Sequence, residues 1–283
     1  MSRPILVALD DSPRTTMVLR AAVVLAQKRN TSLVLLRVVS PPLDIPTEAM
    51  AVSPAEVAGM LRDDGLVQLA KLRAEHCTGV ESQAVALIGM PWETICEKSK
   101  QLDAQLIVMG SHGYEGFDRI LGTTAQKVVN HAESSVLIVR GDPPWKRILC
   151  ALDSATHTRV VLEAATLMSV AFDAELTLLR AVVLPKVPLA ALRHDVNLET
   201  LLCAAATTHL AALQSELPKQ VRVHAAVFVG DPRSLIQREA EHASCVVVGA
   251  HDYNLRERFL GTTAAWVVNH VPCSIFVVRE SRA

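Results

Sequence analysis

The sequence predicts two tandem α/β domains, each built on a mainly parallel sheet with helices on both faces. Three observations predict this fold class. The chain has 283 residues, which is nearly twice the length of a typical single domain. Its second half repeats its first half. Within each half, short apolar runs alternate with stretches of helical pattern, which is the order that βα units produce.

The repeat is clearest between residues 107–140 and 246–279, which align without a gap at a constant offset of 139. They are identical at 17 of 34 positions, including the run Leu-Gly-Thr-Thr-Ala. Earlier segments correspond in the same order: 4–13 with 147–156, 32–42 with 175–185, and 85–95 with 227–236. A period this long indicates a duplicated domain, since solenoid repeats run about 20 to 50 residues. We expect one domain over residues 1–143 and a second over residues 144–283.

The elements of the first half follow from its pattern. Residues 5–9 are continuously apolar, as a strand buried on both faces should be. Ser12 and Pro13 predict the start of a helix, with Ser12 as N-cap and Pro13 at the first helical position. Further strands are predicted at 33–39, 83–88, 105–109 and 135–139, and further helices at 55–77, 91–102 and 123–130.

The composition argues against several classes of protein. Half of the residues are apolar and a fifth are charged, which supports an aliphatic core rather than disorder. The chain has 28 Lys and Arg residues and 29 Asp and Glu residues. It therefore lacks the strongly basic surface to which nucleic acids and anionic membranes bind. No stretch approaches the roughly 20 apolar residues that span a bilayer, and Pro4 leads directly into a strand. We expect a soluble cytoplasmic protein with no nucleic-acid or membrane partner.

Cysteine and histidine residues predict neither a disulfide framework nor a metal site. The chain has six cysteines and no C-x-x-C pair, and no cysteine recurs at the equivalent position of the other half. We expect them to be small buried hydrophobic side chains. His131 and His270 each follow an asparagine at a predicted helix end, where a capping role is expected. No carboxylates accompany them at metal-ligand spacing.

A candidate phosphate site follows the strand at 105–109. Gly110-Ser111-His112-Gly113 leaves that strand, and Gly122-Thr123-Thr124 begins a helix after eight further residues. Glycines allow close approach of the backbone to a ligand, and a helix N-terminus offers N–H groups to a phosphate. The same glycines also suit turns and close packing, so spacing alone leaves both interpretations open. The segment is neither a Walker A loop nor a Rossmann G-x-G-x-x-G motif.

Asp10 ends the first strand and is expected to accept hydrogen bonds from a ribose or a base. If the first and fourth strands are neighbours, the chain winds outward in both directions from between them. Ligands of open α/β sheets bind at such a switch point.

These segments together resemble the universal stress protein family. The resemblance rests on residues 5–12 (ILVALDDS), the loop GSHG followed by GTTA, and the closing NHAESSVLIVR, and it covers both halves. It implies a tandem universal stress protein. The implied fold is an adenine nucleotide alpha hydrolase-like sheet of five parallel strands in the order 3-2-1-4-5.

The resemblance also implies an ATP site in the first half. Because ATP is strongly anionic and only Arg119 and Lys127 are basic residues near the first loop, a Mg²⁺ ion bound with the nucleotide would help. ATP-binding members of the family carry G-x-x-G, nine residues, and then Gly-Ser/Thr. By position, Asp10 and Val38 would contact the adenosine. The phosphates would be held by Gly110, Gly113, Gly122 and Thr123, with Thr124 nearby.

Two departures from the family pattern affect this expectation. Both halves have eight residues where the pattern has nine, and in the second half Asp252 replaces the second glycine. A carboxylate there would repel a polyphosphate, so we expect no ATP in the second half. Weaker binding of a smaller anion is expected from Gly261, Thr262 and Thr263, and Asp153 and Gly249 are the other candidate binding residues of the second half.

Three functions remain open at this point. The first is an ATP-binding regulatory protein that acts in the stress response through an unidentified protein partner. The second is an ATP hydrolase, whose turnover would be slow because no lysine or carboxylate base accompanies the phosphate loop. The third is a nucleotide-independent scaffold or sensor of an apolar ligand, with Leu184–Leu192 lining the cavity or merely covering the sheet.

The fifth strands, Val136–Val139 and Ile275–Val278, would be apolar sheet edges in the implied strand order. An unpaired apolar edge favours aggregation. Universal stress proteins are known for contacts through this strand, so the resemblance implies an internal pseudo-dimer of the two halves. A further homodimer is compatible with it.

Overall fold

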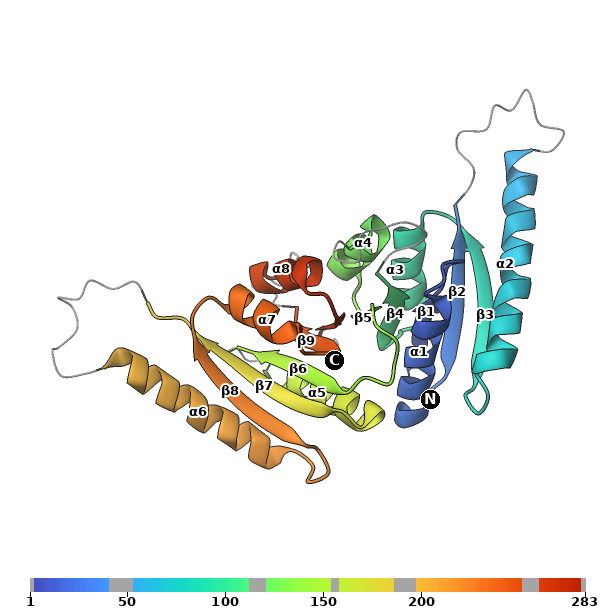
Figure 1. The fold of residues 1–283 in the computed structure, drawn as a ribbon. Helices are drawn as coiled ribbons and strands as arrows, with labels where there is room; N and C mark the ends of the chain where they lie inside the picture. Colours follow the sequence, from blue (N-terminus) through green and yellow to red (C-terminus); the bar gives the residue numbers. More distant parts are fainter. Residues whose placement is uncertain are drawn as a thin grey trace. The chain divides into compact units, whose positions relative to one another are not determined.

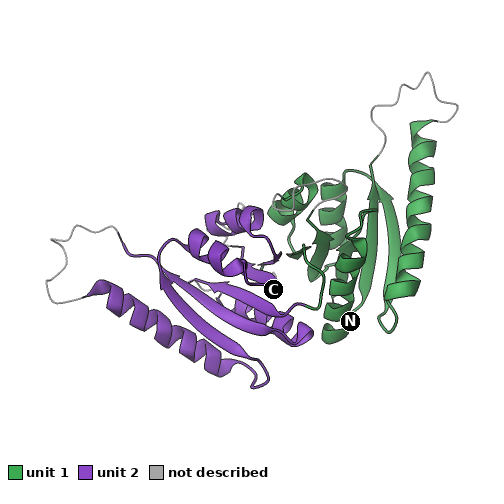
Figure 2. Cartoon of the chain, in the orientation of Figure 1, with its two compact units in different colours: residues 1–144, 254–259, 279–283 green, residues 145–253, 260–278 purple. Residues whose placement is uncertain are grey.

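The computed structural model describes residues 3–40, 53–111, 121–153, 158–185, 197–250 and 260–280. The chain divides into two compact units, and the main division falls between Pro144 and Trp145 (Figure 2). In each unit, five parallel strands form a sheet that is covered by helices (Figure 1). The predicted α/β fold class is confirmed.

Unit 1 alternates strands and helices along its sequence. Its strands are β1 (Ile5–Ala8), β2 (Leu33–Val39), β3 (Ser82–Ile88), β4 (Leu106–Gly110) and β5 (Ser135–Val139). Its helices are α1 (Thr15–Arg29), α2 (Pro54–His76), α3 (Pro91–Gln101) and α4 (Thr123–His131). Hydrogen-bonded neighbours run β3-β2-β1-β4-β5, so the first strand has the second strand on one side and the fourth on the other.

Unit 2 repeats this arrangement. Its strands are β6 (Arg147–Leu152), β7 (Glu175–Val182), β8 (Val223–Val229), β9 (Cys245–Gly249) and β10 (Ser274–Val278). Its helices are α5 (Thr158–Phe172), α6 (Leu198–Glu216), α7 (Pro232–Ala240) and α8 (Thr262–His270). The order β8-β7-β6-β9-β10 corresponds, strand for strand, to that of unit 1.

The strand order determines which helices lie together. Parallel neighbours need crossover connections, and these are almost always right-handed. In unit 1 the chain first moves outward from β1 to β3, and α1 and α2 pack beside each other. It then returns to the other side of β1, and α3 packs beside α4. The direction of winding changes between β1 and β4, which is the switch point at which a ligand is expected.

The central strand of unit 1 is completely enclosed. Ile5, Leu6 and Val7 have no exposed surface, which explains the continuous apolar run in their sequence. Ala8 pairs in register with Leu36 of β2 and with Met109 of β4, so these three strands end at the same edge of the sheet.

The start of α1 differs from the sequence prediction. The helix begins at Thr15 rather than Pro13, and Ser12 is not its N-cap. The physical reason is a turn held by Asp10, whose Oδ1 accepts a hydrogen bond from the Ser12 backbone N–H at 3.0 Å. The Thr15 N–H in turn donates to the Ser12 carbonyl oxygen at 3.1 Å.

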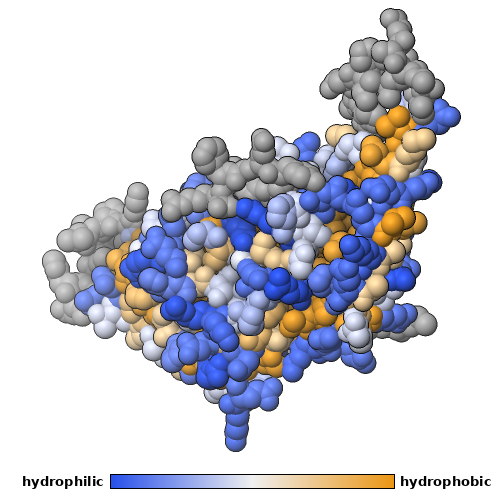
Figure 3. Space-filling model, turned by 45° about the vertical axis from the view of Figure 1, so that its right-hand side comes forward, coloured by the Kyte–Doolittle hydropathy of each residue, from blue (hydrophilic) through white to orange (hydrophobic). Residues whose placement is uncertain are grey.

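Helix α2 has a defined start and a mixed surface. Ser53 and Glu56 form a capping box, in which the Ser53 N–H donates to Glu56 Oε2 at 2.8 Å. Hydrophobic side chains are exposed on this helix at Met60, Leu61, Leu66 and Val67. They form two adjacent pairs separated by the charged run Arg62–Asp64, and the face seen in Figure 3 likewise mixes hydrophobic with hydrophilic side chains. None of the helices in the described segments is both long and apolar enough to cross a membrane.

Most cysteines are core residues. Cys77, Cys150, Cys245 and Cys273 are buried, while Cys96 and Cys203 are half-buried, and all six are free thiols. Burial raises the pKa of Cys150 and Cys245, and it raises the pKa of Cys96 to about 11.

Shortening a central leucine should destabilise either unit to a similar degree. Leu6 of β1 and Leu149 of β6 occupy equivalent positions and are 0% and 2% exposed. Leu6→Ala or Leu149→Ala should lower the free energy of unfolding of its own unit by about 2–5 kcal/mol through lost burial and a residual cavity. The measurement is chemical denaturation, and the control is Leu61→Ala, at an exposed position of α2. A Leu6→Ala effect as small as that of the control would contradict the enclosed position of β1.

The thiols should differ sharply in reactivity. Cys150 and Cys245 should not react with a thiol reagent at pH 8 in the folded protein, because burial blocks access and raises their pKa. Cys203, half-buried on α6, should react first. Counting modified thiols by mass spectrometry before and after denaturation tests this, and Cys203→Ser should remove the fastest phase. Rapid labelling of Cys150 in the folded protein would refute it.

Candidate functional site

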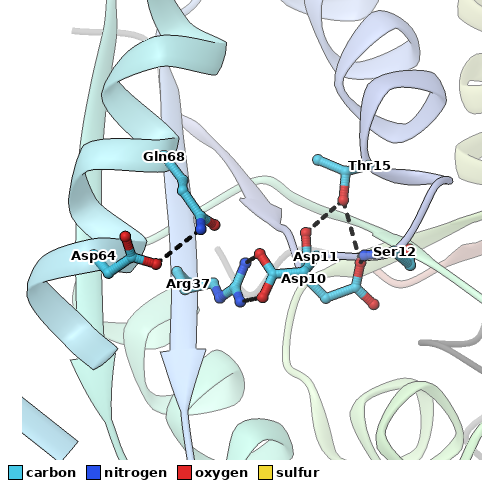
Figure 4. A network of polar contacts seen from close by, with 7 residues as sticks. All are labelled: Asp10, Asp11, Ser12, Thr15, Arg37, Asp64 and Gln68. Atoms are coloured by element: carbon cyan, nitrogen blue, oxygen red, sulfur yellow. Dashed lines mark hydrogen bonds and ion pairs between the residues drawn. The ribbon is translucent and has the colours of Figure 1, made fainter. Parts of the chain in front are cut away.

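Asp10 lies just beyond β1, at the carboxyl edge of the unit 1 sheet. Asp10 organises the turn into α1 through its backbone and its side chain (Figure 4). Thr15 Oγ1 donates to the Asp10 carbonyl oxygen at 2.5 Å and lies 3.2 Å from the carboxylate Oδ1. Asp10 is nevertheless exposed. A carboxylate that is held in place on its own chain and open to solvent is suited to accept hydrogen bonds from a ligand.

Val38 lies near the carboxyl end of the neighbouring strand β2. Ala8, the last residue of β1, pairs with Leu36, and the Leu9 N–H donates to the Leu36 carbonyl oxygen at 2.9 Å. Asp10 and Val38 each follow this last pair by two residues, so both residues expected to contact an adenosine lie at the same edge of the sheet.

Arg37, next to Val38, forms an ion pair with Asp11 that the sequence analysis did not predict (Figure 4). Both guanidinium amino groups donate to the two carboxylate oxygens, which is the bidentate geometry of a strong Arg–carboxylate pair. Helix α2 leaves room for the Arg37 stem at Gly65, because a Cβ there would lie only 3.1 Å from Arg37 Cγ. The pair links β2 to the segment after β1.

Four of the residues expected at the phosphates, Gly110, Gly122, Thr123 and Thr124, lie at the end of β4 and the start of α4. Gly110 ends β4 and Gly122 precedes α4, and the Gly122 N–H donates to the Ser111 carbonyl oxygen at 2.8 Å. No side chain of the described residues caps the N-terminus of α4. Thr123 is exposed and Thr124 half-exposed in its first turn. This helix end therefore offers N–H and hydroxyl groups to an anion.

Some expected residues lie outside the described part of the chain. Gly113 and His112 of the first loop, and His251 and Asp252 of the second, belong to this group. So does most of the segment Leu184–Leu192, the suggested lining of an apolar cavity.

Arg14 is a basic residue at this site that the sequence analysis overlooked. Its Nη1 donates to Ser111 Oγ at 3.1 Å, across 97 residues of sequence. Arg14 is half-buried and Ser111 is completely buried. Nothing in the spacing of the motifs indicates this contact, because it depends on β1 and β4 being neighbours.

The corresponding edge of unit 2 has an equivalent backbone arrangement but different charged residues. Thr158 Oγ1 donates to the Asp153 carbonyl oxygen at 3.2 Å, as Thr15 does to Asp10. Gly249 ends β9, and Gly261 precedes α8, whose N-terminus has no side-chain cap from the part of the chain that the structure describes. Thr262 is exposed and Thr263 is half-exposed.

Arg180 in β7 is the counterpart of Arg37, but Ser154 stands where unit 1 has Asp11. The Nη1 atom of Arg180 is buried and has no hydrogen-bond partner among the described residues. Burial lowers the pKa of Arg180, and the negative charge of Asp153 acts to raise it. The electrostatics of the two edges therefore differ although their strands correspond.

The described residues contain no group of three or more His, Cys, Asp and Glu side chains that could hold a metal ion. At this edge the described residues of unit 1 offer backbone N–H groups, hydroxyls, the guanidinium of Arg14 and the exposed carboxylate of Asp10.

Comparison with known proteins assigns the family. The model of the universal stress protein family matches residues 1–140 and again residues 144–279. Universal stress protein MJ0531 of Methanocaldococcus jannaschii is 35% identical over 105 residues, which are 36% of this chain and 59% of that protein. Universal stress protein A homolog 1 of Coxiella burnetii is 29% identical over 147 residues, which are 48% of this chain and 94% of that protein.

Solved structures agree at the level of the fold. The crystal structure of a universal stress protein from Archaeoglobus fulgidus covers 99% of this chain and 99% of its own, with a TM-score of 0.68 at 19% identity. The structure of protein PA1789 from Pseudomonas aeruginosa PAO1 matches with a TM-score of 0.71, also at 19% identity. Because the family model matches both halves and nearly all of the sequence, the chain belongs to the universal stress protein family as a tandem member.

Proposed function

We propose that unit 1 binds ATP and that the protein is a regulator in the stress response, whose bound nucleotide stabilises a state recognised by another protein. The observation that carries the proposal is the convergence of Asp10 and the uncapped N-terminus of α4 on one edge of the sheet. This edge lies at the switch point between β1 and β4. Membership of the universal stress protein family supports the stress-response role.

In this proposal the nucleotide spans the edge of the sheet. Asp10 accepts from the ribose or base, and Val38 contacts the adenosine. Gly110, Gly113, Gly122 and Thr123 hold the phosphates, with Thr124 nearby. A Mg²⁺ ion would arrive with the nucleotide and be ligated largely by phosphate oxygens and water.

Unit 2 has a different role in the proposal. Gly261, Thr262 and Thr263 remain available for a smaller anion, with Asp153 and Gly249 as further, weaker binding positions, while the carboxylate of Asp252 disfavours a polyphosphate. Nucleotide binding should therefore be confined to one site per chain.

The proposal extends to the organisation of the protein. We place the domains at residues 1–143 and 144–283, and the protein in the cytoplasm. We propose that the domains pair through Val136–Val139 and Ile275–Val278, with a homodimer as a further assembly. The protein has no catalytic residues in this proposal, and its ATP hydrolysis is at most slow.

The alternative function is a nucleotide-independent scaffold or a sensor of another small ligand. The observation that favours it is the loop between Gly113 and Gly122, which in both halves is one residue shorter than the family's ATP-binding pattern.

Replacing Asp10 should weaken nucleotide binding, whereas replacing Asp153 should not. Asp10→Asn keeps an oxygen that can accept from the Ser12 N–H but removes the negative charge that binds a ribose hydroxyl. We expect the ATP affinity to fall by about tenfold or more, as for loss of a charged hydrogen bond. Calorimetric titration of Mg–ATP tests this, with Asp153→Asn as the matched control in unit 2. Equal losses in both variants, or two sites per chain, would contradict the assignment to unit 1.

Gly113→Asp should abolish ATP binding in the otherwise intact protein. The substitution gives unit 1 the residue that unit 2 has at position 252, so it adds a carboxylate beside the phosphates. Calorimetry of the variant, beside mass spectrometry of any small molecule released on denaturation of the wild type, provides the test. If wild type binds no nucleotide and releases a different molecule, the alternative function is the correct one.

A further inference from the structure

We infer that unit 2 binds a short aliphatic monocarboxylate through Arg180, at the edge of its sheet where β6 and β7 end. The carboxylate of this ligand pairs with Arg180 as Asp11 pairs with Arg37 in unit 1. The inference goes beyond the proposed function, because it concerns the other unit and a different class of ligand. It does not require unit 1 to bind ATP.

In unit 1 the equivalent arginine has a carboxylate partner within the chain. The guanidinium of Arg37 donates from both amino groups to the two carboxylate oxygens of Asp11. Only 17% of the Arg37 side chain is exposed. A charge that has lost most of its water is costly without a compensating hydrogen bond, so this pair stabilises an enclosed arginine.

Arg180 occupies the same position in unit 2 without such a partner. It pairs in register with Leu152, the last residue of β6, so its backbone lies where that strand ends. In the sequence, Ser154 stands where unit 1 has Asp11. A serine hydroxyl is neutral and has a single oxygen, so it cannot form a bidentate ion pair with a guanidinium.

The Arg180 guanidinium is left with unused hydrogen-bond donors. Its buried Nη1 has no hydrogen-bond partner, and its guanidinium forms no ion pair, within the described part of the chain. Burial lowers the pKa of Arg180, while the nearby negative charge of Asp153 acts to raise it. A buried donor without a partner is rare in native proteins. An anion that accepts from Arg180 would therefore remove an unfavourable feature of the unoccupied unit.

Charge and geometry together indicate a monocarboxylate. A carboxylate has two oxygens in one plane, which match two N–H groups of a guanidinium. Asp153 already contributes one negative charge near Arg180. Arg180 can neutralise one further negative charge, whereas a dianion would leave an excess of negative charge beside Asp153. We therefore expect a monocarboxylate to bind better than a dicarboxylate or inorganic phosphate.

Apolar side chains near Arg180 indicate the rest of the ligand. On the same face of the sheet, two residues beyond Arg180, Val182 pairs with Val229 of β8. Val229 is exposed although it is apolar, and so are Val183 and Leu184, which directly follow β7. A short aliphatic chain on the carboxylate would remove part of this apolar surface from water, which favours binding.

The first test removes the arginine and uses butyrate as the probe. Titration of ¹³C-labelled butyrate, followed by NMR at constant ionic strength, should give one site per chain in the wild type. We expect Arg180→Gln to weaken this binding by about tenfold or more, as for loss of a charged hydrogen bond. Formate, succinate and inorganic phosphate should each bind more weakly than butyrate. The matched control is Arg159→Gln on α5, whose exposed ion pair with Glu216 contributes little to stability.

The second test exchanges the partner carboxylate between the units. Ser154→Asp should provide Arg180 with a partner inside the chain, and so abolish butyrate binding and raise the denaturation midpoint of unit 2. Asp11→Ser should leave Arg37 unpaired and so create a second butyrate site. These two variants keep the inference testable even if Arg180→Gln does not fold.

Each other outcome has a defined meaning. No butyrate binding by the wild type overturns the inference, and so does binding that persists unchanged in Arg180→Gln or Ser154→Asp. Tighter binding of phosphate than of butyrate overturns the assigned class of ligand. Mg–ATP titration of the Arg180→Gln and Ser154→Asp variants reports on unit 1 separately, and ATP affinity should be unchanged in both. Butyrate binding without any ATP binding would overturn the proposed ATP function alone.

Discussion

The candidate site depends on the turn that Asp10 closes after the central strand. Residues Ile5 to Val7 of β1 are fully buried, so the chain must leave the core without burying polar groups that lack hydrogen bonds. The Asp10 side chain and carbonyl oxygen accept from Ser12 and Thr15, which delays the start of α1 until Thr15. The same turn exposes the Asp10 carboxylate and places Arg14 beside Ser111. A local requirement of the backbone thus positions both charged groups of the site.

The two units show how a duplicated fold can diverge in chemistry without changing its framework. Strand order and the ends of the equivalent strands correspond, because they follow from buried apolar residues that both halves retain. The charges at the edge do not correspond. Arg37 has Asp11 as its partner, while Arg180 has a buried Nη1 without a hydrogen bond among the described residues and Asp153 nearby. Exposed edge residues can change without cost to the core, so divergence there is physically easy.

In the proposed function, unit 1 binds the anion mainly through its backbone geometry. The N-terminus of α4 presents N–H groups that no side chain of the described residues caps, and its first turn carries two threonine hydroxyls. Such a site needs little from side chains beyond a cation and a hydrogen-bond acceptor for the nucleoside. This proposal accounts for the small residues of the motif, Gly110, Gly113, Gly122 and Thr123. It also accounts for the strong loss of affinity for a polyphosphate that we expect from a carboxylate at position 113.

The sequence by itself determined the duplication, the α/β class and the approximate strands. These follow from the 139-residue offset and from apolar periodicity, which are patterns readable along the chain. It also located Asp10, Gly110 and Gly122, since strand ends and helix starts have local signatures. Only the tertiary structure decided which side chains meet at the edge. The contact of Arg14 with Ser111 and the pair of Arg37 with Asp11 join residues 97 and 26 positions apart. Their positions depend on which strands become neighbours, and strand neighbours are determined by packing of the whole core rather than by any local pattern.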